Sequence, residues 1–327
     1  MDLIKKIHHY LFNEIEEMNK VVVNSLAVEE NLIQIMSNYL SNAGGKRIRP
    51  ILIILSAKMF GYKGDQSIKL AAAIEFIHMA TLLHDDVVDG SKMRRFLPTA
   101  NVVWGSKASI LVGDFLFSQS FKLIVSTESM IAMKTLADAA AIIIEGEVTQ
   151  LTKLEQKRIV SEDEYLKVIK AKTAELFGAA CAVGAIIARR EDKVDVMKNF
   201  GLQLGNIFQI SDDALDYFSD YRKVGKNIGD DFYEGKVTLP IILLAKALSN
   251  IDRIKLKLMF EVSRRSKTDF NWVKEQMVTH KIDQIILQYT NNLKNKLLIL
   301  LDQIPVIEEE SKQYMRNLVE FAINRTH

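Results

Sequence analysis

Two groups of aspartates share the spacing Asp-Asp-x-x-Asp, the first in LLHDDVVDG and the second in FQISDDALDYF. In a helix, residues at this spacing lie within about one turn and place three carboxylates on one face. Like charges so placed cost a helix about 0.2–0.5 kcal/mol each, so we expect a cation on each face. The two clusters consist of Asp85, Asp86, Asp89, Asp212, Asp213 and Asp216.

Oxygen ligands without histidine or cysteine favour magnesium, which keeps several waters and bridges to substrate phosphates. The clusters therefore imply a phosphate-bearing substrate. A solvated acidic helix end is the alternative for either cluster alone, since short motifs also occur by chance. The repeated spacing, each time at the polar end of an apolar stretch such as EFIHMATLL, favours a metal site.

Basic residues are concentrated in two loop segments, GGKRIRP and MRRFLPT. Guanidinium groups match the oxygens of phosphates. A solvated surface charge is the alternative for any one of them. Their position beside glycine turns and directly after an acidic helix favours diphosphate binding by the group Lys46, Arg47, Arg49, Arg94 and Arg95.

The elements that carry these residues are predicted to be helices. Only four prolines interrupt the chain, and the stretches between them are rich in helix-forming residues. We predict an all-α fold and, because no linker or repeat is visible, a single domain over residues 1–327. Helical stretches are expected at residues 3–40, 50–60, 65–89, 106–126, 129–154, 161–188 and 192–217, and again from residue 241, with a break at 263–271 and a functional loop at 219–240.

Composition limits the remaining possibilities. The net charge of +2 does not suggest nucleic acid as a partner, and the single cysteine, Cys181, excludes an internal disulfide and a cysteine-based zinc site. The N-terminus lacks the apolar core of a secretory signal. The longest uncharged segment near the middle, residues 176–188, is too short to cross a bilayer. We predict a cytoplasmic protein without a transmembrane segment.

The motifs GGKRIRP, HMATLLHDDVVDGSKMRR, AKTAELF, FQISDDALDY and VGKNIGDDFYEGKVTLP occur in this order. In this respect the chain resembles the trans-isoprenyl (polyprenyl) diphosphate synthase family from GGKRIRP through GKVTLP, with weaker similarity beyond. The resemblance implies packed helices around a deep central cavity, with the aspartate motifs facing across its mouth, and a homodimer. One departure is Phe96, where the family commonly has glycine after the arginine pair.

The resemblance also implies a reaction. Magnesium ions, three of them with substrate bound, would be held by Asp85, Asp89 and Asp212, supported by the other three aspartates. An allylic diphosphate would lose its diphosphate and leave an allylic cation. The double bond of isopentenyl diphosphate would attack this cation, and the departing diphosphate would accept the proton. The product would be delivered to a membrane.

Individual binding residues come from the same resemblance. Lys172 is counted with the aspartates as catalytic, and His78, which on an apolar helix would otherwise be interpreted as a core residue, joins the isopentenyl site. Isopentenyl diphosphate would be held by Lys46, Arg49, His78 and Arg95. The allylic diphosphate would contact Arg94, Lys172, Thr173, Gln209, Lys226 and Lys236.

Product length is expected to depend on the helix turns before Asp85. Ala80 lies five residues upstream, about 7.5 Å along a helix axis. Family members with short products tend to have an aromatic residue near Ala80 or Thr81, whereas HMATLLHDD resembles the long-chain enzymes that make quinone side chains. We predict a product of about octaprenyl length, limited by Ala73, Ile77, Ala80 and Thr81.

Several alternatives stay open at this point. A short-chain synthase would make farnesyl or geranylgeranyl diphosphate. A noncatalytic regulatory subunit of a synthase is a second alternative, although its aspartates would typically be lost. A terpene cyclase usually lacks the second aspartate motif, and a nucleic-acid-binding bundle is disfavoured because paired acidic faces repel phosphate backbones.

Overall fold

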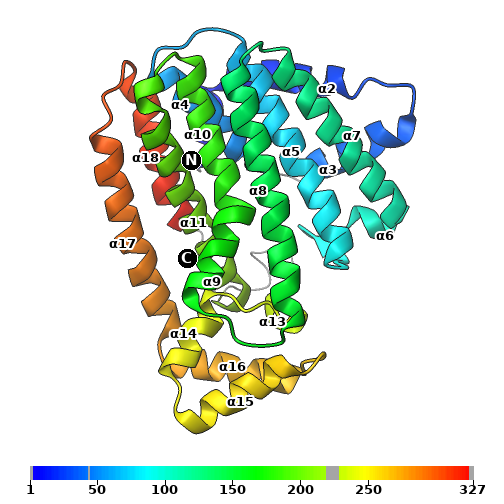
Figure 1. Ribbon diagram of the computed structural model, residues 1–327, viewed down its shortest axis with the longest axis vertical. Coiled ribbons are helices and arrows are strands. Elements are labelled where there is room, and N and C mark those ends of the chain that lie inside the picture. The colour runs from blue at the N-terminus through cyan, green and yellow to red at the C-terminus, as the bar shows by residue number, and fades with distance from the viewer. Residues whose placement is uncertain (1–2, 43–44, 219–227, 324–327) are drawn as a thin grey trace. The chain divides into compact units, whose positions relative to one another are not determined.

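The computed structural model describes residues 3–42, 45–218 and 228–323, and nearly all of its regular structure is helical (Figure 1). The predicted all-α fold is confirmed. The first part of the chain forms α1 (Leu3–Tyr10), α2 (Phe12–Ser25), α3 (Asn31–Asn42), α4 (Ile48–Met59), α5 (Gln66–Val88), α6 (Ala100–Trp104), α7 (Ser106–Val125) and α8 (Met130–Glu155).

The second part continues the helical pattern, with one π-helical segment, η1, and one short 3-10 helix, η2. Most predicted stretches agree with the observed helices to within a few residues. The exceptions are residues 3–40, which form three helices, and residues 161–188, which η1 interrupts. The elements are α9 (Glu162–Ile169), η1 (Lys170–Ala174), α10 (Glu175–Ile187), η2 (Glu191–Lys193), α11 (Val194–Phe218), α13 (Asp230–Glu234), α14 (Leu239–Ala247), α15 (Asn250–Glu261), α16 (Lys267–Thr279), α17 (Ile282–Asp302) and α18 (Glu309–Ile323). The break expected at 263–271 is shorter, because α16 begins at Lys267, and the loop expected at 219–240 contains the short helix α13.

The chain divides into two compact units, and neither is continuous in sequence. The first unit consists of Met1–Ala140, Leu176–Gly201 and Leu301–Leu318, and the second of Ala141–Glu175, Leu202–Leu300 and Val319–His327. The first aspartate cluster belongs to the first unit and the second cluster to the second unit. The prediction of a single domain stays a prediction.

Helix α5 forms the core of the first unit. It carries apolar residues around its whole circumference, as expected of a helix covered on all sides, and it packs against α7, α4 and α2. The approach of α7 is close at Gly113, where an added Cβ would lie 2.3 Å from Nε2 of His84. This packing fixes the end of α5 that carries the first aspartate cluster.

A small hairpin follows α5, although no strand was predicted. Strands β1 (Met93–Arg94) and β2 (Leu97–Pro98) pair antiparallel. The two residues between them, Arg95 and Phe96, have φ values of 51° and 67°. Glycine adopts this left-handed backbone freely, whereas another residue there costs about 1–2 kcal/mol. Phe96 therefore takes the conformation that the family's glycine would favour.

The second unit has its own apolar core, formed by residues of α9, α11 and α13 to α17. Phe232 is fully buried in it and packs edge-to-face against Phe260. Helix α9 begins with a capping box, in which the Ser161 hydroxyl accepts from the Glu164 backbone and the Glu164 carboxylate accepts from the Ser161 backbone. These contacts fix the start of the segment that carries Lys172 and Thr173.

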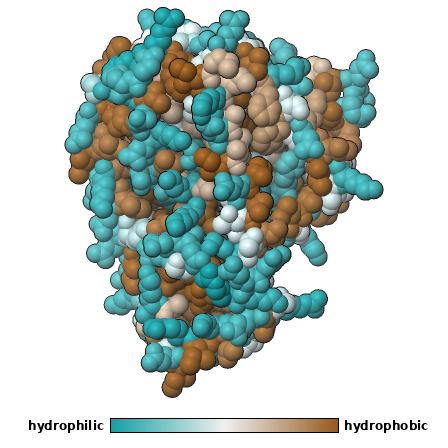
Figure 2. Space-filling view, viewed as in Figure 1, coloured by the Kyte–Doolittle hydropathy of each residue, from teal (hydrophilic) through white to brown (hydrophobic). Residues whose placement is uncertain are grey.

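Within the described residues, α7 alone is long and apolar enough to span a membrane, and a third of its most apolar window is buried. Core helices of soluble proteins meet the same criterion, so membrane insertion does not follow. Several of its apolar side chains are nevertheless exposed, among them Ile110, Leu111, Phe121 and Val125. Figure 2 shows apolar side chains at the surface between the hydrophilic ones.

The single cysteine lies in the core of the first unit. Cys181 on α10 is fully buried, and burial raises the pKa of its thiol to about 12. A thiol in this state is neutral and unreactive.

Candidate active site

The first aspartate cluster lies at the C-terminal end of α5. Asp85 and Asp86 belong to the last turn, and Asp89 is the C-cap residue. The C-terminus of a helix carries partial negative charge, so carboxylates there are destabilising unless a cation is close. The last turn of α5 contains no basic residue. The predicted grouping of three carboxylates at one helix end is therefore present, and its charge calls for a partner from outside the helix.

Asp86 has such a partner in Arg94 of the hairpin. Nη2 and Nε of Arg94 donate to Oδ1 of Asp86 at 2.8 and 3.0 Å. Asp86 is 1% exposed, whereas Asp85 and Asp89 are partly exposed. The hairpin thus holds the middle carboxylate and leaves the outer two accessible from solvent.

Basic residues surround the middle of α5 on the same unit. Burial lowers the pKa of His78 well below its ordinary value, and the charges of Arg49, Arg95 and Arg94 lower it further. An added Cβ on Gly45 would lie 3.2 Å from Nη1 of Arg95, so the loop before α4 approaches this guanidinium. The structure therefore brings Arg49, His78 and Arg95 together, with exposed Lys46 next to Gly45.

The second aspartate cluster lies in the last two turns of α11. Asp212 is partly exposed, whereas Asp213 and Asp216 are buried. Tyr165 donates to Oδ2 of Asp213 at 2.6 Å, and Nε2 of Gln209 donates to Oδ1 at 2.7 Å. Burial, followed by the negative charge of Asp231, raises the pKa of Asp213 to about 8.

Asp216 is tied to the segment that leads into α13. The backbone N–H of Asp231 donates to Oδ2 of Asp216 at 3.1 Å, and the N–H of Gly229 donates to its backbone oxygen at 2.9 Å. Gly229 has a φ of 86°, and an added Cβ would lie 2.5 Å from the ring of Phe270. Only glycine fits this turn, and the turn holds Asp216.

The π-helical segment η1 carries Lys172 and Thr173. Such segments add one residue to a helical turn and often occur at functional sites. Gly146 of α8 permits a close approach, because an added Cβ would lie 2.8 Å from the Cβ of Ala171. At this contact Nζ of Lys172 donates to Glu147 at 2.7 Å and to Gln150 at 3.0 Å.

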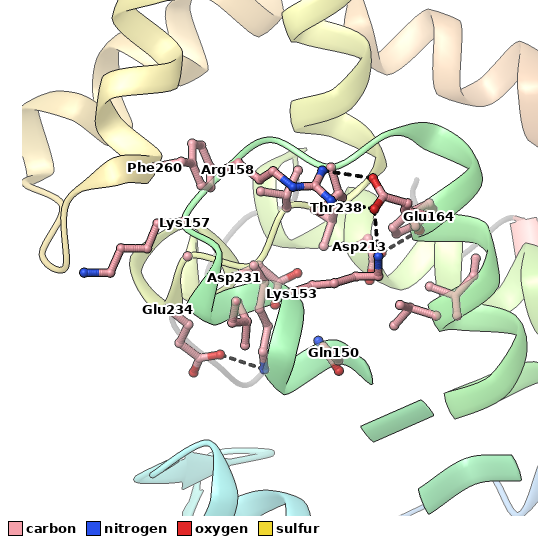
Figure 3. Close-up of a pocket in the computed structure, with 18 of the residues that line it drawn as sticks. Gln150, Lys153, Lys157, Arg158, Glu164, Asp213, Asp231, Glu234, Thr238 and Phe260 are labelled. Atoms are coloured by element: carbon pink, nitrogen blue, oxygen red, sulfur yellow. Dashed lines mark hydrogen bonds and ion pairs between the residues drawn. The ribbon is translucent and has the colours of Figure 1, made fainter. Parts of the chain in front are cut away.

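A cavity of about 350 Å³ opens within the second unit (Figure 3). Its wall includes five residues with predicted roles, namely Lys172, Thr173, Gln209, Asp213 and Lys236. Lys236 forms an ion pair with Glu234 at 2.8 Å in this wall. The volume is typical of small-molecule sites. Lys226 lies outside the described residues.

Sequence interpretation missed several residues that hold the predicted ones. Glu147 and Gln150 bind Lys172, and Tyr165 binds Asp213. The apolar periodicity of α9 indicates that the Tyr165 ring is in the core. No signal in the sequence indicates which residue its hydroxyl binds. Within the described residues, no group of three or more His, Cys, Asp or Glu side chains is arranged to hold a metal ion.

Comparison with known proteins identifies the family of the chain. Residues 30–277 match the model of the polyprenyl synthetase family. The chain belongs to this family. As a member it is a polyprenyl diphosphate synthase, a prenyltransferase, and the predicted enzyme class is confirmed.

Two similar relatives are octaprenyl diphosphate synthases. That of Escherichia coli (strain K12) is 41% identical over 240 residues, which cover 73% of this chain and 74% of the relative. That of Haemophilus influenzae is 37% identical over 319 residues, covering 96% and 94%. A polyprenyl synthase structure from Caulobacter crescentus CB15, complexed with calcium and isoprenyl diphosphate, matches with a TM-score of 0.93 and 36% identity over 99% of this chain and 98% of that one.

Proposed function

We propose that this polyprenyl diphosphate synthase makes a long-chain all-trans product of about octaprenyl length for quinone side chains. The observation that carries the proposal is the small size of the side chains on α5 before Asp85. Ala73 and Ala80 are fully buried alanines, and Ile77 is 1% exposed. The octaprenyl diphosphate synthases among the similar relatives support the same product length.

The tunnel proposal concerns the turns of α5 that precede the aspartates. Thr81, one residue beyond Ala80, donates its hydroxyl to the backbone oxygen of His78 at 2.9 Å and so keeps its polar group on the helix. No aromatic side chain stands at Ala80 or Thr81 to end a growing chain early. Ala80→Phe should therefore shorten the product.

The carboxylates present fit magnesium by their donor chemistry, although no three of them are gathered into one group within the described residues. All six are oxygen donors, and three of them, Asp85, Asp89 and Asp212, are partly exposed while the other three are buried and hydrogen-bonded. We propose that the exposed three are the direct ligands, supported by the buried three, and that three ions are bound when substrate is present. Bound magnesium supplies Lewis-acid stabilisation of the negative charge on the leaving diphosphate.

The chain's own residues orient two diphosphates. We propose that Lys46, Arg49, His78 and Arg95 hold isopentenyl diphosphate, and that the cavity of the second unit holds the allylic diphosphate with Arg94 and Lys226. The C–O bond of the allylic substrate breaks, and its electron pair leaves with the diphosphate. The double bond of isopentenyl diphosphate forms the new C–C bond, and the leaving diphosphate takes the proton.

We also propose an oligomeric state and a location for the protein. The exposed apolar side chains of α7, with Leu111 at 68% and Val125 at 56%, support a homodimer in which a second copy covers this face. Light scattering should give the mass of a dimer, and Leu111→Glu should shift it towards the monomer. We also propose that both units act as one catalytic domain, in the cytoplasm, with delivery of the product to a membrane.

Product analysis by mass spectrometry tests the main proposal. The purified protein receives magnesium, an allylic primer and excess isopentenyl diphosphate, and products near eight isoprene units are expected. Products that stop at three or four units would identify a short-chain synthase instead. Release of no diphosphate by the purified protein would favour a regulatory subunit.

A further inference from the structure

A buried phenol contacts the second aspartate cluster. Tyr165 of α9 is 4% exposed, and its hydroxyl donates to Oδ2 of Asp213 at 2.6 Å. Asp213 is itself buried, so water does not compete for this hydrogen bond.

The other oxygen of Asp213 begins a chain of hydrogen bonds. Nε2 of Gln209 donates to Oδ1 of Asp213 at 2.7 Å, and Oε1 of Gln209 accepts from the hydroxyl of Thr173 at 2.7 Å. An amide has a donor end and an acceptor end, so the end that faces Asp213 decides which end faces Thr173. Asp213 thus orients the Gln209 amide, and the amide in turn orients the Thr173 hydroxyl.

We propose that Tyr165 is a positioning residue for the allylic diphosphate site and acts through Asp213, Gln209 and Thr173. This inference rests on the proposed function of the cavity, because all four residues line the cavity, and its wall also includes Lys172 and Lys236. Tyr165 fixes one oxygen of Asp213, and this leaves the other oxygen turned towards Gln209. Without the phenol, the buried carboxylate loses a donor and rotates, and the Gln209 amide loses its fixed orientation.

Conservative variants can distinguish the role of the Tyr165 hydroxyl from the packing of its ring. Its ring belongs to the apolar core of the second unit, which also includes Ile169 and Ile210. Phenylalanine would fill the same space, so Tyr165→Phe removes the hydroxyl and keeps the packing. Tyr289 gives a matched control, because it packs against the same core and its hydroxyl interacts with Glu162 rather than with Asp213.

Steady-state kinetics with both substrates varied form the first test. In Tyr165→Phe the KM for the allylic diphosphate should rise about tenfold, since a buried oxygen of Asp213 loses its hydrogen-bond donor, while the KM for isopentenyl diphosphate changes less than about twofold. Tyr289→Phe should change neither. Equal increases in both KM values, or unchanged values in Tyr165→Phe, would overturn the proposal.

A binding measurement without turnover forms the second test. Calorimetry with magnesium and an unreactive allylic thiolodiphosphate should show a dissociation constant about tenfold higher in Tyr165→Phe than in the wild type. Gln209→Ala should weaken binding in the same selective way, and the double variant should be no weaker than Gln209→Ala alone. If the increases in dissociation constant multiply in the double variant, Tyr165 acts independently of Gln209, and the proposed series of hydrogen bonds is refuted.

The proposed function is tested separately by the wild type. A wild-type protein that neither binds the allylic analogue nor makes product contradicts the proposed function itself. If Tyr165→Phe does not fold, Gln209→Ala interrupts the same chain one residue further on. An unchanged allylic KM in Gln209→Ala then overturns the positioning role.

Discussion

The metal-free protein should lose stability between pH 6 and pH 8 because of Asp213. Burial and the charge of Asp231 raise the pKa of its carboxyl from 3.8 to about 8. At pH 6 the folded protein still holds this proton, whereas the unfolded chain, with its ordinary pKa, has released it. The folded state binds more protons throughout this range, so the free energy of unfolding falls as pH rises and levels off above the folded pKa.

The size of the effect follows from the two pKa values. Each pH unit changes the free energy of unfolding by about 1.4 kcal/mol while the folded carboxyl is protonated and the unfolded one is ionised. Because the folded group begins to ionise near pH 8, the loss between pH 6 and pH 8 is about 2 kcal/mol. For a chain of this length, the corresponding decrease in Tm is about 3 °C.

Thermal unfolding in EDTA at pH 6, 7 and 8 measures this loss. Asparagine cannot titrate, so Asp213→Asn should lack the component of about 2 kcal/mol, and subtraction removes every other titrating group. Asp192→Asn, a surface change on η2, should follow the wild type because Arg190 and Lys193 hold the pKa of Asp192 below its ordinary value. The same pH-dependent loss in Asp213→Asn and wild type would refute the reasoning.

Three further changes test other contacts. Arg94→Gln should lower the free energy of unfolding, measured in urea, by about 2–3 kcal/mol because Asp86 is left buried without its charged partner. Adding Asp86→Asn should recover part of this loss, and losses that simply add would contradict the pairing. Gly146→Ala should displace η1, at a cost of about 1–3 kcal/mol, and raise the KM for the allylic diphosphate; an unchanged KM would mean that η1 accommodates the methyl group. Phe96→Gly should raise stability by up to about 1 kcal/mol by relieving the left-handed backbone, whereas a lower Tm would show that the Phe96 ring contributes more than this strain costs.

Helices were predictable because their signals are local. The apolar periodicity and the glycine turns around α5 and α11 gave the helix ends that carry both aspartate clusters, and the observed bounds agree closely. The π-helical insertion at η1 was not predictable, because one extra residue in a helical turn leaves no mark in hydrophobic periodicity. It alters the direction in which Lys172 points, and therefore its contacts with Glu147 and Gln150.

The sequence identified the aspartates but not the side chains that bind them. It grouped Asp86 with the metal ligands and Arg94 with the diphosphate ligands, whereas in the structure these two side chains bind each other. Strands of two residues have no detectable period, so the hairpin that turns Arg94 back onto α5 could not be foreseen. Tyr165 was hidden for another reason, since a buried tyrosine satisfies an apolar pattern with its ring whatever its hydroxyl contacts.

Labelling of the Cys181 thiol can report local unfolding of the first unit. Reagents that require a thiolate cannot reach a fully buried group whose pKa is about 12, so labelling has to wait for a fluctuation that exposes α10. The labelling rate under native conditions then measures how often the core of the first unit opens. Because the chain has no other cysteine, a cysteine introduced at an exposed position would be modified long before Cys181 and would carry a probe without any background.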